Sequence, residues 1–171
     1  LRADVRTHQG KAAFMFGTVQ DITQRRQREQ KIQELAYYDS LTGLPNRRLF
    51  TDQLTRAISQ AQRHNRTLVT MFLDVDDLKH INDTLGHDAG DSMLREVARR
   101  LMDCLRASDG VSRDPDNGFV EAIASVARIG GDEFTILLPE VNRADDAAVV
   151  ARRVLASLSK PMVLVGQEIM I

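Results

Sequence analysis

The residues with the clearest chemical potential are carboxylates that follow an apolar run. The largely apolar segment 68–73 has the length of a buried strand, and it leads directly into Asp74, Asp76 and Asp77. Folds that combine helices with a central sheet place their chemistry at the ends of such strands. We therefore interpret Asp74 as a candidate ligand for a metal or a substrate.

A second acidic pair lies beside a predicted hairpin turn. The segment 130–133, Gly-Gly-Asp-Glu, separates strand-like runs at 126–129 and 134–138. Its two glycines permit positive φ angles and let another group approach the backbone closely. Asp132 and Glu133 follow them at once. An isolated acidic turn is most often only solvated. The acidic strand end at Asp74 makes this hairpin a stronger candidate for a functional site.

Two acidic strand ends that converge would suit a hard divalent cation. Magnesium prefers oxygen ligands and usually shares them with the phosphates of a substrate. The pattern therefore favours metal-assisted phosphoryl or nucleotidyl transfer. By spacing alone, a calcium site and a surface acid cluster remain open, although the aspartates do not follow the calcium-loop spacing with its terminal glutamate.

The elements that must position these residues follow from the apolar periodicity. Helical spacing occurs in three segments: 49–61, 94–105 and 147–158. Two further strand-like runs, 162–165 and 168–171, enclose a predicted Gly166-Gln167 turn. The order of helix, strand, helix, hairpin, helix and strands predicts an α/β domain with helices packed on a mixed central sheet.

Composition narrows the class of protein. The 171 residues are 43% hydrophobic and 27% charged, with a net charge of -1, which is ordinary for a globular domain and argues against nucleic-acid binding. The single cysteine excludes an internal disulfide and fits a cytoplasmic setting. Since no apolar run approaches the length of a membrane span, we expect no membrane contact from this segment.

Three longer segments together resemble one known family. They read Asp-Ser-Leu-Thr-Gly-Leu-Pro-Asn-Arg-Arg at 39–48, Phe-Leu-Asp-Val-Asp-Asp-Leu-Lys-His-Ile-Asn-Asp at 72–83 with Gly-His-Asp-Ala-Gly-Asp at 86–91, and Ala-Arg-Ile-Gly-Gly-Asp-Glu-Phe at 127–134. In order and type they are similar to the motifs of the GGDEF diguanylate cyclases. The resemblance implies a palm-like α+β fold, similar to class III nucleotide cyclases. It also implies condensation of two GTP molecules into cyclic di-GMP with release of two pyrophosphates.

The resemblance assigns metal and catalytic roles. Asp74, Asp132 and Glu133 would bind Mg²⁺ or Mn²⁺, together with the main-chain carbonyl of Val75. Asp132 or Glu133 would help to deprotonate the attacking 3′-hydroxyl, and which of the two does so stays open. Because one domain binds one GTP, the resemblance implies that catalysis needs a homodimer.

The resemblance also assigns the substrate contacts. Asn82 and Asp91 would hydrogen-bond the guanine, which disfavours an adenylyl-type cyclase. The remaining substrate-binding residues lie near the phosphates or in the turn: Asp77, Leu78, Lys79, Gly130 and Gly131. Lys79 suits the phosphates as a flexible point charge.

Two features depart from the family pattern. Arg106 and Asp109 match the spacing of a product-inhibition site for cyclic di-GMP. In this chain, however, residues 110–129 separate them from the hairpin, whereas the family usually has only a few residues there. A helix-end arginine with a cap-like aspartate is the equal alternative. The chain also stops at Ile171, before a strand and helix that the family usually has, so we expect a C-terminally truncated domain.

The beginning of the chain has a different character. Residues 11–20 alternate like a strand, and a helix beginning near Thr23 carries no apolar residue until Ile32. Segment 17–26 resembles the end of a PAS sensor domain entering a signalling helix; an arbitrary strand and a polar linker are the alternative. We therefore expect a PAS-like tail at 1–22, a connector helix at 23–38 and the GGDEF domain at 39–171.

Two functions fit these features. The first is a diguanylate cyclase controlled by an upstream sensor, which the intact Gly-Gly-Asp-Glu-Phe favours. The second is a catalytically silent GTP-binding domain that regulates an attached cyclic di-GMP phosphodiesterase (EAL) domain, since segment 160–168 also resembles the approach to such a domain.

Overall fold

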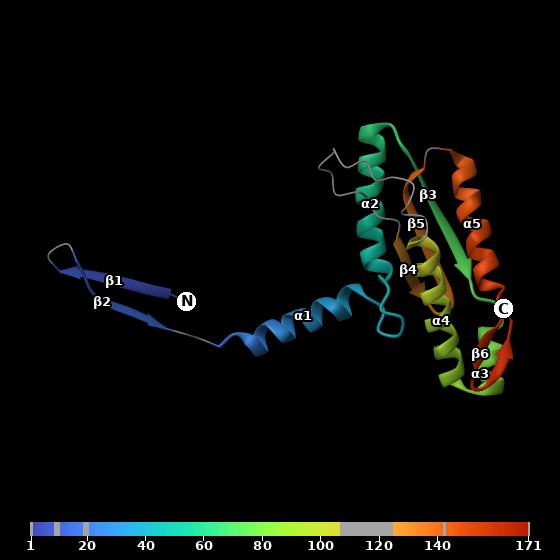
Figure 1. Cartoon of the computed structure of the whole chain (residues 1–171), viewed down its shortest axis with the longest axis horizontal. Coiled ribbons are helices and arrows are strands. Elements are labelled where there is room, and N and C mark those ends of the chain that lie inside the picture. Colours follow the sequence, from blue (N-terminus) through green and yellow to red (C-terminus); the bar gives the residue numbers. More distant parts are fainter. Residues whose placement is uncertain (1, 9–10, 19–20, 107–124, 142, 171) are drawn as a thin grey trace. The chain divides into compact units, whose positions relative to one another are not determined.

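The protein, represented by a computed structural model, forms two compact units, Leu1–Leu35 and Ala36–Ile171. The structure describes residues 2–8, 11–18, 21–106, 125–141 and 143–170, and Figure 1 shows their elements. The boundary between the units falls inside the helix that joins the N-terminal hairpin to the larger unit. The domain limits expected from the sequence stay predictions.

The first unit holds a β-hairpin and most of a helix. Strands β1 (Arg2–His8) and β2 (Lys11–Thr18) pair antiparallel, and α1 (Thr23–Tyr37) follows. The predicted strand and the predicted start of the helix are confirmed. At the start of this helix, Asp21 Oδ1 accepts the Thr23 N–H at 2.8 Å. Asp21 therefore supplies the side-chain cap, and hydrogen bonds from the Thr23 hydroxyl and from the Thr23 N–H lower the pKa of its carboxyl.

A three-stranded sheet forms the centre of the second unit. Its strands β3 (Thr67–Asp74), β4 (Ser125–Gly130) and β5 (Glu133–Val141) have the order β3-β5-β4. β4 and β5 form a hairpin, and β3 pairs antiparallel with the other edge of β5. All three strands were predicted and are confirmed. We expected a mixed sheet, and the pairs among the described strands are all antiparallel.

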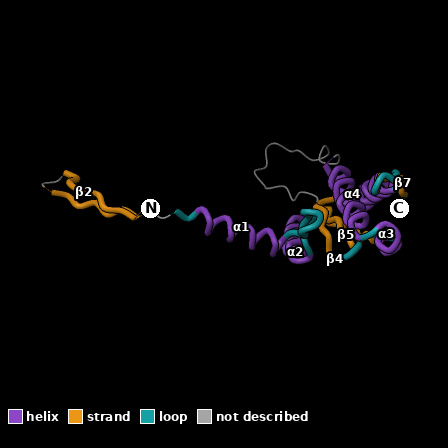
Figure 2. The backbone as a smooth tube through the Cα atoms, turned by 90° about the horizontal axis from the view of Figure 1, so that it is seen from below, coloured by secondary structure: helices purple, strands orange, loops and turns teal. Residues whose placement is uncertain are grey.

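Helices and a second hairpin surround this sheet. They are α2 (Arg47–His64), α3 (Leu78–Leu85), α4 (His87–Arg106), α5 (Ala144–Leu158), β6 (Met162–Leu164) and β7 (Gln167–Ile169). In Figure 2, α2 lies on one side of β4 and β5, and α3 and α4 lie on the other. The predicted helices and the predicted packing of helices on a central sheet are confirmed.

Burial on both faces explains why β5 is apolar at successive positions. Phe134, Ile136 and Leu138 point into the main core, which α4 lines with Val97 and other residues. The alternate residue Leu137 joins Phe50 of α2 in a second cluster. The two clusters hold the sheet between helices and thereby fix the positions of the end of β3 and of the β4–β5 turn.

The C-terminal hairpin corrects one prediction. Leu164 pairs with Gln167, so the turn consists of Val165 and Gly166 and not of Gly166 and Gln167. Both turn residues have positive φ, 51° for Val165 and 78° for Gly166. Two-residue turns with positive φ at both positions match the twist of the strands they join; glycine adopts this conformation freely, whereas the β-branched Val165 adopts it with strain.

Candidate active site

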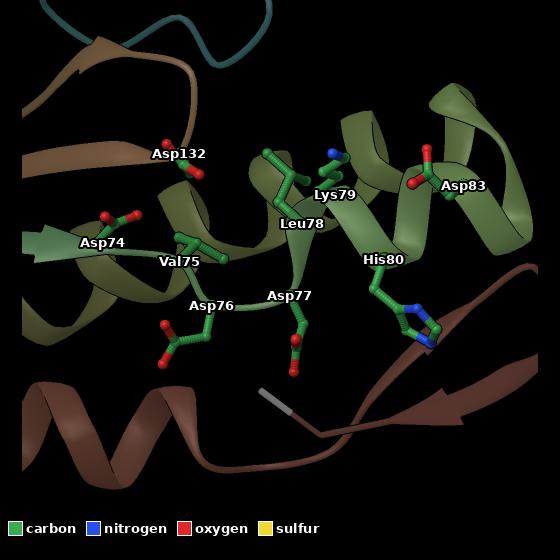
Figure 3. A pocket seen from close by; sticks show the side chains of 9 residues that line it. All are labelled: Asp74, Val75, Asp76, Asp77, Leu78, Lys79, His80, Asp83 and Asp132. Carbon is green, nitrogen blue, oxygen red and sulfur yellow. The ribbon is translucent and has the colours of Figure 1, made fainter.

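A pocket of about 470 Å³ lies where the end of β3 meets the β4–β5 turn and the start of α3. The residues that line it are Asp74, Val75, Asp76, Asp77, Leu78, Lys79, His80, Asp83 and Asp132. Figure 3 shows these side chains around the loop between β3 and α3, with Asp132 entering from the turn. The pocket is therefore built from two segments that lie far apart in the sequence.

Sheet register brings the two acidic segments together. Asp74, the last residue of β3, lies opposite Glu133 in β5. The Val75 N–H donates to the Asp132 carbonyl at 3.2 Å, which ties the strand end to the turn. Asp74 and Asp132 consequently line the same pocket, and Figure 3 shows both carboxylates on one side of it. The convergence expected from the sequence is present for these two residues.

The donor set fits a magnesium ion shared with a substrate. Within the described residues, no three His, Cys, Asp or Glu side chains gather to hold a metal ion. Magnesium, however, is usually held by one or two carboxylates and completes its shell with phosphates and water. Asp74 and Asp132, with the carbonyl of the buried Val75, supply oxygen donors of that kind.

The opposite wall of the pocket begins α3. Asp77 precedes the helix in a left-handed conformation, with φ 60° and ψ 8°, and its side chain makes no capping hydrogen bond. Non-glycine residues adopt this conformation rarely, and such strain gathers at functional sites. The start of the helix thus carries its partial positive charge beside the exposed Lys79. The helix start and Lys79 can meet phosphate groups, whereas the carboxylates on this wall repel them unless a cation lies between. The wall also holds Asp76, His80 and Asp83, to which sequence reasoning assigned no role.

Asn82 and Asp91 lie outside this set of lining residues. They lie on α3 and α4, which pack against each other. Asn82 is half-buried, and Asp91 lies 3.8 Å from Arg95 as an ion pair. The two predicted guanine contacts are thus held by neighbouring helices rather than by the acidic pocket.

Glu133 and the glycines stand at the rim of the turn. The Glu133 carboxylate lies 3.8 Å from the Arg47 guanidinium, and both side chains are exposed. Gly131 has φ 55°, which a residue with a side chain adopts only with strain, so the turn requires glycine there. Among the acidic hairpin residues, Asp132 alone faces the pocket in this structure.

Arg128 fastens the turn to the segment that follows α1, a tie that sequence reasoning missed. Its Nε and Nη2 donate to the Gly131 carbonyl at 2.9 and 2.6 Å, and its Nη1 donates to Asp39 Oδ1 at 3.1 Å. Thr42 also donates to Asp39 through its N–H and its hydroxyl. Both ends of the tie lie in the motifs 39–48 and 127–134, but their spacing gave no sign of contact.

The surroundings of the Asp39 carboxyl favour its ionised form. Partial burial raises its pKa, but hydrogen bonds from Thr42 and Arg128 outweigh that effect and bring the pKa below its usual value. The ionised Asp39 carboxylate is therefore the form that pairs with Arg128. Of the predicted product-inhibition pair, Arg106 ends α4, whereas Asp109 lies outside the described residues.

Comparison with known proteins identifies the family. The model of the family described as "Diguanylate cyclase, GGDEF domain" matches residues 36–124 and 118–171. The chain therefore belongs to the GGDEF family, as the sequence motifs predicted. None of the described helices is long and apolar enough to span a membrane.

Individual relatives agree with this assignment. The chain is 41% identical over 127 residues to the diguanylate cyclase TpbB of Pseudomonas aeruginosa, covering 74% of this chain and 26% of TpbB. It is 38% identical over 138 residues to the bifunctional diguanylate cyclase/cyclic di-GMP phosphodiesterase MucR of the same species, covering 81% of this chain and 18% of MucR. The chain thus spans about a quarter or less of the length of these relatives.

A solved structure shares the fold. The GGDEF domain of TpbB from Pseudomonas aeruginosa superposes with a TM-score of 0.66 at 38% identity. The match covers 78% of this chain and 70% of that one. The predicted palm-like class is therefore confirmed.

Proposed function

We propose that this domain condenses two GTP molecules into cyclic di-GMP and releases two pyrophosphates. The observation that carries this proposal is the meeting of Asp74 and Asp132 in one pocket beside the start of α3. Family membership and the cyclase relatives support it. In this proposal the segment works in the cytoplasm, where GTP is available.

The proposed reaction uses two walls of the pocket for different tasks. Asp74, Asp132 and the Val75 carbonyl would hold Mg²⁺ or Mn²⁺, which would polarise the α-phosphate and lower the pKa of the attacking 3′-hydroxyl. Lys79 and the N–H groups of Asp77 and Leu78 would neutralise the phosphates. Most of the rate gain then comes from positioning and charge neutralisation, not from covalent chemistry on the protein.

The acid–base and base-recognition roles rest on the hairpin and the two neighbouring helices. Asp132 or Glu133 would accept the proton of the 3′-hydroxyl, and Asn82 with Asp91 would recognise the guanine. Each domain would present one GTP, so two domains would face each other across a two-fold axis and each bound nucleotide would attack the other. Cyclic di-GMP would then leave as the product.

A second function is a silent GTP-binding domain that regulates an attached phosphodiesterase. Its support is that NbdA of Pseudomonas aeruginosa, 34% identical to this chain over 138 residues, is named a cyclic di-GMP phosphodiesterase and not a cyclase. The test is to incubate the full-length protein with GTP and Mg²⁺ and to follow cyclic di-GMP and bound GTP separately. Product formation supports the cyclase, whereas GTP binding without product from a folded dimer supports the regulatory domain.

A further inference from the structure

Gly90 stands in the first turns of α4, where the helix gives no backbone reason for a glycine. Its φ is not among the positive values found at the turn glycines such as Gly86 and Gly131. Glycine within a helix costs about 1 kcal/mol relative to alanine. The residue is also buried, so its selection calls for a reason in the packing around it.

The space that a side chain at position 90 would fill is taken by Asn82. A Cβ on Gly90 would come 2.0 Å from Asn82 Oδ1 and 2.9 Å from Asn82 Cγ. The next nearest atom, Leu78 Cδ1, would lie at 3.2 Å. The carboxamide of Asn82 therefore rests against the bare backbone of α4, in a seat that exists only because residue 90 lacks a side chain.

We propose that Gly90 is a positioning residue for guanine recognition: it seats the Asn82 carboxamide beside Asp91, so that the two polar groups act on the same base. This inference rests on the proposed cyclase function. Gly90 is the chain neighbour of Asp91, and the seat brings Asn82 of α3 to the same turn of α4. The glycine thus joins two recognition groups that belong to different helices.

A purely structural role predicts a different response to mutation. If Gly90 served close packing of α3 on α4, adding a methyl group would push the helices apart and lower stability. The two closest atoms, however, belong to the flexible side chain of Asn82, so Gly90→Ala is accommodated when that side chain swings away about its Cα–Cβ bond. Stability then stays equal or rises, since alanine is the better helix former, while guanine recognition is lost.

The experiment measures binding of α,β-methylene-GTP, whose α–β bridge resists cleavage, to the full-length protein with Mg²⁺. Gly90→Ala should weaken binding about tenfold, the loss expected when a hydrogen bond worth about 1.4 kcal/mol is removed. Its melting temperature should equal or exceed that of the wild type. The matched control is Ser92→Ala, an exposed change on the same helix that removes a hydroxyl donating to the Asp88 carbonyl; this variant should bind like the wild type.

A double-mutant cycle tests whether Gly90→Ala weakens binding through the displaced Asn82 side chain. In an Asn82→Ala background, Gly90→Ala should cause no further loss of affinity, because the group it displaces is gone. An equal loss in both backgrounds, or unchanged binding in Gly90→Ala itself, overturns the inference while leaving the cyclase proposal intact. Absence of binding by the wild type overturns the proposed function, and the inference with it.

Discussion

Replacing Arg128 by methionine should loosen the β4–β5 turn and lower the stability of the second unit. The Arg128 side chain is only 11% exposed, and it donates to both the Gly131 carbonyl and the Asp39 carboxylate. Methionine keeps most of the apolar stem and removes the charged donors. The change therefore isolates the polar tie between the turn and the segment that follows α1.

The magnitude follows from how far the pair is buried. Removing one partner of a buried ion pair costs about 3–5 kcal/mol. Asp39 is 22% exposed and keeps its hydrogen bonds from Thr42, so we expect a smaller loss of about 2–3 kcal/mol. For a unit of this size, roughly 3 °C of melting temperature is lost per kcal/mol, which gives a drop of about 6–9 °C.

Thermal unfolding followed by circular dichroism checks this expectation. Arg66→Met is the matched control: Arg66 lies 2.7 Å from Glu140, but both side chains are more than half exposed. Exposed pairs contribute about 0–1 kcal/mol, so the control should lose about 3 °C or less. If Arg128→Met loses no more than Arg66→Met, the tie contributes no more than an exposed ion pair, and the reasoning from burial is refuted. A cycle with Asp39→Ala should show coupling of about 1 kcal/mol or more.

Three further outcomes are expected. Asp74→Ala should abolish formation of cyclic di-GMP and leave the melting temperature without nucleotide nearly unchanged, because its side chain is exposed; a large loss of stability would mark Asp74 as structural. The pKa of Glu96 is lowered from 4.5 to about 2, chiefly by the hydrogen bond from Arg99, with burial opposing and Arg100 assisting. The stability that this carboxylate contributes is therefore complete above its unfolded pKa of 4.5 and disappears as the pH falls to about 2, so urea midpoints of the wild type and Glu96→Gln should converge over that interval. Asn46→Ala removes the acceptor for two N–H groups at the start of α2 and the amide that donates to the Ala36 carbonyl, and it should cost about 1–2 kcal/mol in urea unfolding; an unchanged midpoint would show that water replaces these bonds.

The strongest periodic elements could be predicted from the sequence because their burial repeats regularly. The helix α4 and the strand β5 present apolar residues at the spacing that their cores demand. The short helix α3 was not predicted as a separate element. It has eight residues and only Gly86 separates it from α4, so its few apolar positions merge with those of the longer helix.

Contacts between distant segments could not be predicted from spacing. Asp39 and Arg128 stand 89 positions apart, and nothing in either motif states that they touch. The seat of Asn82 against Gly90 depends on how α3 packs on α4, which periodicity does not specify. The acidic pocket was predicted because both of its acidic segments end strands, and the register of β3 with β5 then places Asp74 beside the turn.

The most direct test of the account is the stoichiometry of the proposed reaction. The full-length protein is incubated with GTP and Mg²⁺, and cyclic di-GMP and pyrophosphate are measured together over time, with Asp132→Asn as the reference that lacks the pocket carboxylate of the turn. We expect two pyrophosphates for each cyclic di-GMP in the wild type and neither product from Asp132→Asn. A folded, dimeric wild-type protein that binds GTP and forms no cyclic di-GMP would contradict the proposed reaction.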